Sequence, residues 1–154
     1  MVIDDDEPTN YISTMVFEEV ECANQLLVFE SGESALHYIS QTLTKPGKND
    51  CLPDMIFLDI NMPRMNGWEF LEAFQQFDPP LSQTVIIMLT TSLNPDDELR
   101  ANDLTAVAGF ENKPITAGMV QRLIHTHFTK GACFEQFSYP SVHQPTVGND
   151  PCNS

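Results

Sequence analysis

The feature that most constrains the fold is a short apolar run followed by a stretch of helical period, repeated five times along the chain. The apolar runs, rich in Val, Ile, Leu and Met, lie at residues 1–3, 26–29, 55–58, 85–89 and 107–110. The helical stretches follow at 9–23, 34–43, 67–77, 95–102 and 118–128, and the first carries Ile12, Met15, Val16 and Val20 on one side. Short apolar runs joined by helices predict an α/β fold with a doubly wound, five-stranded parallel sheet and helices on both faces.

Polar residues stand at the carboxyl ends of the predicted strands. Asp4, Asp5 and Asp6 follow the first strand, Asp59 the third, Thr90 the fourth and Lys113 the fifth. Doubly wound sheets bind ligands outside the carboxyl ends of their strands, so we expect these residues to form the functional site. Asp6 has a second reading, because with Pro8 it is a typical start for the first helix.

These residue types suit phosphoryl transfer. Carboxylates gathered in one cleft repel each other unless a cation lies between them, and oxygen ligands with open water positions suit Mg²⁺. A lysine and a metal neutralise charge on a phosphoryl group, a hydroxyl bonds one of its oxygens, and an aspartate is a known nucleophile. Lys113 precedes Pro114, and an X-Pro bond can adopt the cis form at low cost, which would direct the lysine toward the cleft.

Four segments in this order resemble the motifs of response-regulator receiver domains. They are "VIDDDEP", "IFLDINMPRMNGWEFL", "IIMLTTSLNPDD" and "GFENKPI", and the resemblance covers roughly residues 1–128. It implies a flavodoxin-like sheet with strand order 2-1-3-4-5. Each motif alone is weak evidence, whereas their order is specific.

The resemblance also implies a role for each site residue. Asp59 is the phosphoacceptor, Asp5 a direct Mg²⁺ ligand and Asp4 a ligand through water, while Asn61 offers its backbone carbonyl to the metal. Thr90 is the switch hydroxyl, Lys113 contacts the phosphoryl group, and Phe110 is the switch aromatic. Phe110 is equally well explained as a core residue, because aromatic side chains dominate protein cores.

The composition narrows the range of possible binding partners. The chain has 22 acidic and 7 basic residues, a formal net charge of -15, so its field repels nucleic acids and anionic membranes. We find no apolar run long enough to span a membrane and no signal segment, and therefore expect a cytoplasmic protein. The implied partners are a histidine kinase or phosphotransfer protein as phosphodonor and a downstream target protein, with no substrate turnover.

Two parts of the chain are expected, a receiver domain at 1–129 and an irregular tail at 130–154, which is rich in Pro and polar residues. The four cysteines are scattered and are interpreted as unpaired thiols.

Two alternatives stay open. A Mg²⁺ phosphatase of the haloacid dehalogenase type also uses an aspartate nucleophile, a hydroxyl and a lysine, although in another order along the chain. A pseudo-receiver would keep the fold as a binding module without phosphorylation.

Overall fold

The computed structural model describes residues 1–45, 47, 51–77, 83–91 and 107–128, which form a five-stranded parallel sheet. The strands are β1 (Val2–Ile3), β2 (Val28–Phe29), β3 (Met55–Asp59), β4 (Val85–Thr90) and β5 (Val107–Asn112). Their order across the sheet is β2-β1-β3-β4-β5, with every neighbouring pair parallel. The predicted fold class and strand order are confirmed.

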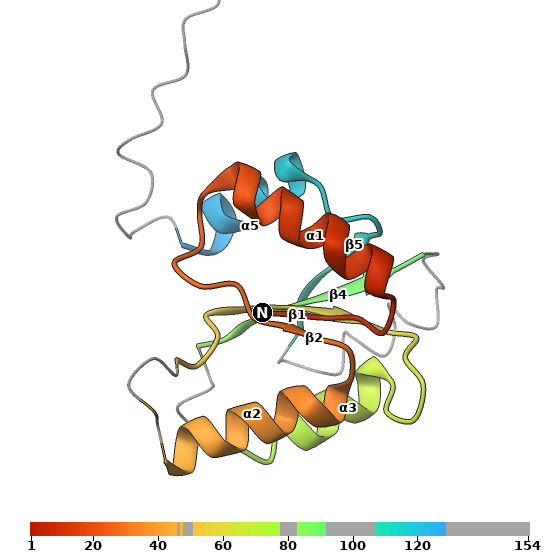
Figure 1. Ribbon diagram of the computed structural model, residues 1–154, viewed down its shortest axis with the longest axis vertical. Coiled ribbons are helices and arrows are strands. Elements are labelled where there is room, and N and C mark those ends of the chain that lie inside the picture. The colour runs from red at the N-terminus through yellow and green to blue at the C-terminus, as the bar shows by residue number, and fades with distance from the viewer. Residues whose placement is uncertain (46, 48–50, 78–82, 92–106, 129–154) are drawn as a thin grey trace, which may run out of the picture.

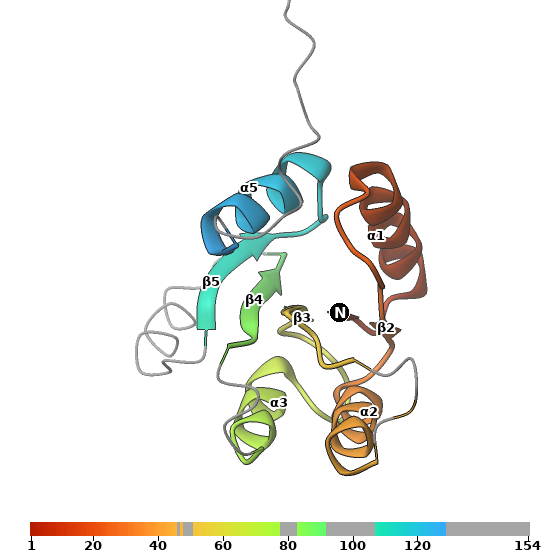
Figure 2. The same cartoon turned by 90° about the vertical axis from the view of Figure 1, so that its left-hand side faces the viewer.

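Helices cover both faces of the sheet (Figure 1, Figure 2). They are α1 (Glu7–Val20), α2 (Gly32–Thr44), α3 (Gly67–Phe74) and α5 (Ala117–His127). Helices α1 and α5 lie on one face and contact each other, while α2 and α3 lie together on the other face. The helix predicted at 95–102 and the tail at 130–154 fall outside the described residues.

The core is divided by the sheet into two clusters, and consecutive residues of β3 belong to different ones. Ile56 and Leu58 pack with the residues of α2 and α3, whereas Phe57 packs with those of α1 and α5. The three side chains are at most 1% exposed. A strand buried on both faces needs an unbroken apolar sequence, which is why the predicted runs show no alternation.

Helix α1 turns a different side to the core than its apolar pattern indicates. Its buried residues are Asn10, Ser13, Phe17 and Val20. Ile12 is 48% exposed and Met15 53% exposed, next to Tyr11 at 68%. Of the predicted apolar side, Val20 is buried and Val16 packs partly buried against the same cluster, so the prediction was wrong for Ile12 and Met15.

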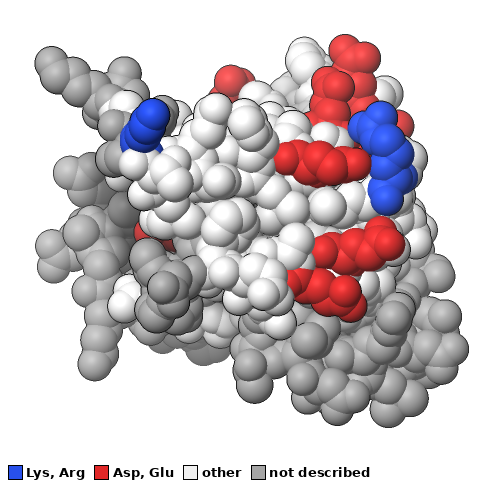
Figure 3. Space-filling model, turned by 90° about the horizontal axis from the view of Figure 1, so that it is seen from below, with Lys and Arg blue, Asp and Glu red and all other residues white. Residues whose placement is uncertain are grey.

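Acidic side chains are visible on the molecule seen from the side of α2 and α3 (Figure 3). Glu33 forms an exposed ion pair with Arg64, with 3.5 Å between Oε1 and Nε. None of the helices in the described part of the chain is long and apolar enough to cross a membrane. Cys22 is partly buried and Cys51 is exposed, while the other two cysteines lie outside the described ranges.

Candidate functional site

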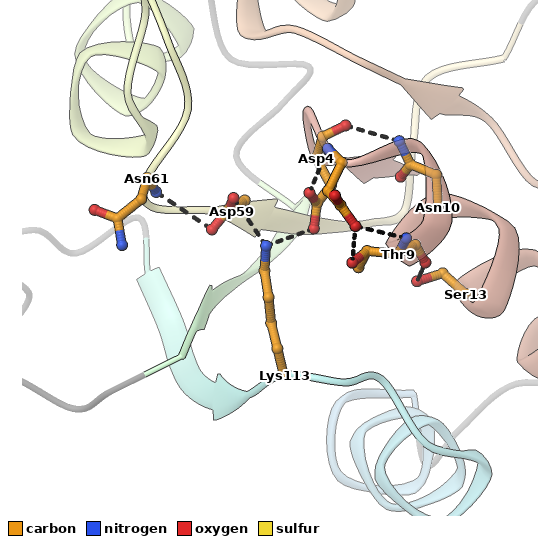
Figure 4. A network of polar contacts seen from close by, with 8 residues as sticks. Asp4, Thr9, Asn10, Ser13, Asp59, Asn61 and Lys113 are labelled. Carbon is orange, nitrogen blue, oxygen red and sulfur yellow. Dashed lines mark hydrogen bonds and ion pairs between the residues drawn. The ribbon is translucent and has the colours of Figure 1, made fainter.

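Three charged side chains from three strand ends meet at one edge of the sheet (Figure 4). Lys113, just after β5, places its Nζ 2.6 Å from Asp4 Oδ2 and 2.8 Å from Asp59 Oδ2. Asp4 is fully buried and Asp59 is 5% exposed. The Lys113–Pro114 peptide bond is cis. Charges this far from water require partners, and these three partner each other.

Asp5 completes a group of three carboxylates. One carboxylate oxygen each from Asp4, Asp5 and Asp59 lie within 4.8 Å of one another, with Asp5 exposed at the mouth of the group. Three hard oxygen donors with one side open to water match the coordination that Mg²⁺ prefers. The residues present therefore fit a divalent cation of this kind.

The acidic loop, formed by Asp4, Asp5 and Asp6 after β1, is shaped by the start of α1. Asp6 is the N-cap of the helix, and its carboxylate accepts hydrogen bonds from both the backbone amide and the hydroxyl of Thr9. The backbone amide of Asp6 in turn donates to Asp4 Oδ1 at 3.0 Å. The capping role predicted for Asp6 is thus confirmed, and the cap ties the loop to the helix.

The loop after β3 folds closely against Asp59. The backbone amide of Asn61 donates to Asp59 Oδ1 at 3.2 Å, and that of Gly67 donates to the carbonyl of Ile60 at 2.9 Å. A Cβ atom on Gly67 would lie 2.7 Å from the Asp59 carbonyl oxygen, so the close approach requires glycine. The contact of Asn61 is through its amide, and a metal contact of its carbonyl stays a prediction.

Thr90 and Phe110 lie on the neighbouring strands β4 and β5. Thr90 ends β4 and is 3% exposed, and its carbonyl accepts a hydrogen bond from the Lys113 amide at 2.9 Å. Phe110 is half-buried and packs at a tilt against the ring of Trp68 in α3, with 6.2 Å between ring centroids. The switch roles of both residues stay predictions.

Burial and pairing act in opposite directions on the two partners of the ion pair. Burial is the largest influence on Asp4 and raises its pKa above the ordinary 3.8, although Lys113 opposes this. Burial alone would lower the pKa of Lys113, but the hydrogen bonds and charges of Asp4 and Asp59 outweigh it and raise this pKa above 10.5. Because Asp59 also contacts Lys113, the charged form of the lysine is stabilised by both carboxylates and not by Asp4 alone.

Sequence reasoning missed two residues that contact this site or its switch. Asn10 donates from its buried side chain to the backbone carbonyl of Asp4, and Trp68 packs on Phe110. Asn10 stands near other polar residues of the helix, Thr9, Ser13 and Thr14, so no local signal distinguished it. Nothing local to Trp68 pointed to Phe110, which is 42 positions away in the sequence.

The chain resembles known response regulators in sequence and structure. Residues 1–125 match the family described as response regulator receiver domain. The response regulator Rcp1 of Synechocystis is 26% identical over 104 residues, covering 68% of this chain and 69% of that protein. A two-component response regulator from Cytophaga hutchinsonii superimposes with a TM-score of 0.74 at 27% identity, covering 84% of this chain and 95% of that one.

A further solved structure is the Mn²⁺-bound form of response regulator Rcp1, with a TM-score of 0.60 at 23% identity. It covers 91% of this chain and 96% of that one, and at this identity it shows the common fold. The family match spans most of the chain, and the sheet has the order found in that fold. The chain therefore belongs to the response regulator receiver domain family of two-component signalling.

Proposed function

We propose that residues 1–129 act as a phosphoacceptor domain that takes a phosphoryl group from a phosphohistidine protein onto Asp59. The observation that carries the proposal is the contact of one lysine with two buried carboxylates, Lys113 with Asp59 and Asp4. A third carboxylate, that of Asp5, lies within 4.8 Å of the other two. This is a nucleophile beside the charges that phosphoryl transfer needs.

The transfer forms one bond and breaks another. A carboxylate oxygen of Asp59 attacks the phosphorus, and the electron pair of the breaking P–N bond passes to the imidazole nitrogen of the donor. The Lys113 ammonium offsets negative charge on the phosphoryl oxygens, and the Thr90 hydroxyl donates a hydrogen bond to one of them. The phosphoryl group stays on Asp59, so the domain modifies itself and does not turn over an external substrate.

Mg²⁺ is the proposed cofactor. Asp4, Asp5, Asp59 and the backbone carbonyl of Asn61 would hold it, and when bound it supplies positive charge against the phosphoryl oxygens and the carboxylates. The oxygen donors of the group support this assignment. So does the relative Rcp1, which has been solved in a Mn²⁺-bound form.

The phosphodonor is proposed to be a histidine kinase or phosphotransfer protein that rests on α1. A donor histidine must approach Asp59, and the donor protein then contacts the surface beside the acidic loop, where α1 begins. Tyr11, Ile12 and Met15 form an apolar strip there and are 68%, 48% and 53% exposed. Acidic residues at the same end of α1, such as Glu7, favour a donor with an apolar contact surface bordered by basic residues.

The proposed output is a change in contacts with a downstream protein. When a phosphoryl group draws the Thr90 hydroxyl toward it, Phe110 gains room to repack, and the surface around β5 changes. The supporting observation is that Thr90 and Phe110 lie on paired strands. The Thr90 carbonyl also accepts a hydrogen bond from the Lys113 backbone amide.

Incubation with phosphoramidate and Mg²⁺, followed by intact-mass measurement, tests the proposal. We expect one added phosphoryl group, none when EDTA removes the metal, and none at this site in Asp59→Asn. Undiminished labelling of Asp59→Asn would refute the assignment of the nucleophile. Steady release of phosphate from a generic ester would instead indicate a phosphatase, and no labelling at all would indicate a pseudo-receiver.

A further inference from the structure

Asn10 is a polar residue on the side of α1 that faces the sheet. Its side chain is 6% exposed, and its Nδ2 donates to the backbone carbonyl of Asp4 at 2.7 Å (Figure 4). Its Oδ1 has no hydrogen-bond partner among the described residues. A buried acceptor without a partner costs stability, and an apolar side chain of similar size would avoid that cost. Asn10 therefore contributes through its hydrogen-bond donor, the side-chain Nδ2.

The acceptor of this hydrogen bond stands where the sheet gives way to the acidic loop. Asp4 follows β1, and its backbone amide still donates a hydrogen bond to the carbonyl of Phe29, the last residue of β2, at 3.0 Å. The carbonyl of Asp4 and the amide of Asp5 belong to the same planar peptide group. Whatever holds that carbonyl also sets the direction in which the chain enters Asp5.

Asp5 depends on its backbone for its position. Its side chain is exposed, yet one of its carboxylate oxygens lies within 4.8 Å of those of Asp4 and Asp59, which are both buried. Asp4 and Asp59 are held directly by Lys113. The exposed Asp5 is joined to Asp4 by the peptide group whose carbonyl accepts the hydrogen bond from Asn10.

We infer that Asn10 is a positioning residue for the metal site, acting through the Asp4–Asp5 peptide group on the carboxylate of Asp5. The inference rests on the proposed function, because that function gives Asp5 its role as a ligand. Asn10 itself touches neither the metal nor the phosphoryl group. It lowers the freedom of the loop so that three carboxylates converge before a cation arrives.

The neighbouring contacts are different in kind. The Asp6 amide holds the side chain of Asp4, and the Asp6 carboxylate caps α1 through Thr9. Ser13 offers a matched control, because it is 1% exposed on the same side of α1 and donates to a backbone carbonyl. That carbonyl belongs to Thr9 within the helix, at 2.9 Å, and not to the acidic loop.

The test compares the full chain with Asn10→Leu, Asn10→Ala and Ser13→Ala. Calorimetric titration with Mg²⁺ alone is expected to show affinity reduced about tenfold in both Asn10 variants and unchanged in Ser13→Ala. Amide exchange of the metal-free proteins provides a second measurement. The Asp6 amide, which bonds to Asp4 Oδ1, exchanges faster in the Asn10 variants, while the Phe57 amide in β3 does not.

Other outcomes would overturn either the inference about Asn10 or the proposed function. Unchanged Mg²⁺ affinity in folded Asn10→Leu or Asn10→Ala overturns the inference, as does an equal loss in Ser13→Ala. If neither Asn10 variant folds and Asn10→Gln, which keeps the amide donor, also fails, Asn10 serves the fold and not the loop, and the inference is overturned. Failure of the wild type to bind Mg²⁺ or to accept a phosphoryl group at Asp59 refutes the proposed function itself.

Discussion

Lys113 reaches Asp59 across the end of an intervening strand. Asp59 ends β3 and Lys113 follows β5, so β4 lies between them in the sheet, yet Nζ and Oδ2 are 2.8 Å apart. The same Nζ lies 2.6 Å from Asp4, which follows β1 on the far side of β3. One side chain thus joins the ends of three strands, and this arrangement makes its removal consequential for both folding and phosphorylation.

Lys113→Met is expected to lower the free energy of unfolding of the metal-free protein by about 3 kcal/mol at neutral pH, since it leaves two buried carboxylates without their cation. Arg122→Met is the control, because Arg122 pairs with Glu111 at 2.8 Å while 57% exposed, and its loss should cost less than about 1 kcal/mol. Denaturant unfolding in EDTA measures both. Equal losses in the two variants would contradict the prediction.

The pH dependence of the same difference follows from the raised pKa of Lys113. A lysine whose pKa is higher in the folded state stabilises that state fully below the ordinary value of 10.5, and this contribution is lost as pH rises through the folded-state pKa. The gap in unfolding free energy between wild type and Lys113→Met should therefore be steady from about pH 8 to 10 and narrow above that range.

Asp5→Asn is expected to weaken Mg²⁺ binding about tenfold or more, because it removes one of three carboxylates while the fold is left intact. Asp5 is exposed, so the melting temperature without metal should change little. Glu7→Gln, also exposed and two residues further on, removes the same charge outside the group and serves as the control. Equal effects of the two variants on calorimetric titration would mean that only general charge is involved.

Thr90→Ala is expected to accept a phosphoryl group at Asp59 yet lose most of the conformational response, because Asp59 and the metal ligands remain while the hydroxyl is gone. Trp68 is the only tryptophan and packs on Phe110, so its fluorescence reports repacking of that ring. Thr84→Ala, at the other end of β4, is the control. An equal fluorescence change in Thr90→Ala and wild type on addition of beryllofluoride would refute the role of the Thr90 hydroxyl as the link to Phe110.

Gly67→Ala is expected to destabilise the protein by about 1–3 kcal/mol, because the new Cβ would lie 2.7 Å from the carbonyl oxygen of Asp59 and force the loop apart. The rate of labelling by phosphoramidate should fall as well. Gly118→Ala in α5 has nothing within 4 Å of its Cβ and should be neutral or stabilising by up to about 1 kcal/mol. Denaturant unfolding separates the two, and similar values would refute the contact at Gly67.

Tyr11→Ser and Met15→Ser are expected to slow phosphorylation by a protein donor several-fold while leaving phosphorylation by phosphoramidate unchanged. The small donor needs no contact with α1, whereas a protein donor would lose apolar contacts on that surface. Val28→Ser is the control, because Val28 is also exposed, at 36%, but lies on β2 and not on α1. Equal slowing with both donors would place the effect in the site and not in the contact.

The sequence by itself determined the architecture and was sufficient to predict the main site residues. Five apolar runs without alternation can be buried only in a parallel sheet covered on both faces, and parallel strands place their carboxyl ends at one edge. Asp4, Asp59 and Lys113 each stand at such an end, so their convergence follows from local pattern and connectivity. The cap at Asp6 was likewise readable, because a cap involves residues only three positions apart.

Only the tertiary structure decided which side of α1 faces the core. The helix carries two stripes at helical spacing, one with Ile12 and Met15 and the other with Asn10, Ser13 and Phe17, and hydropathy favours the first. The second is buried because its polar members find backbone carbonyls to bond, Asn10 at Asp4 and Ser13 at Thr9. The carbonyl of Asp4 comes within reach of Asn10 only once β1, its loop and α1 have packed together. Burial of a polar group depends on such acceptors, which hydropathy does not record.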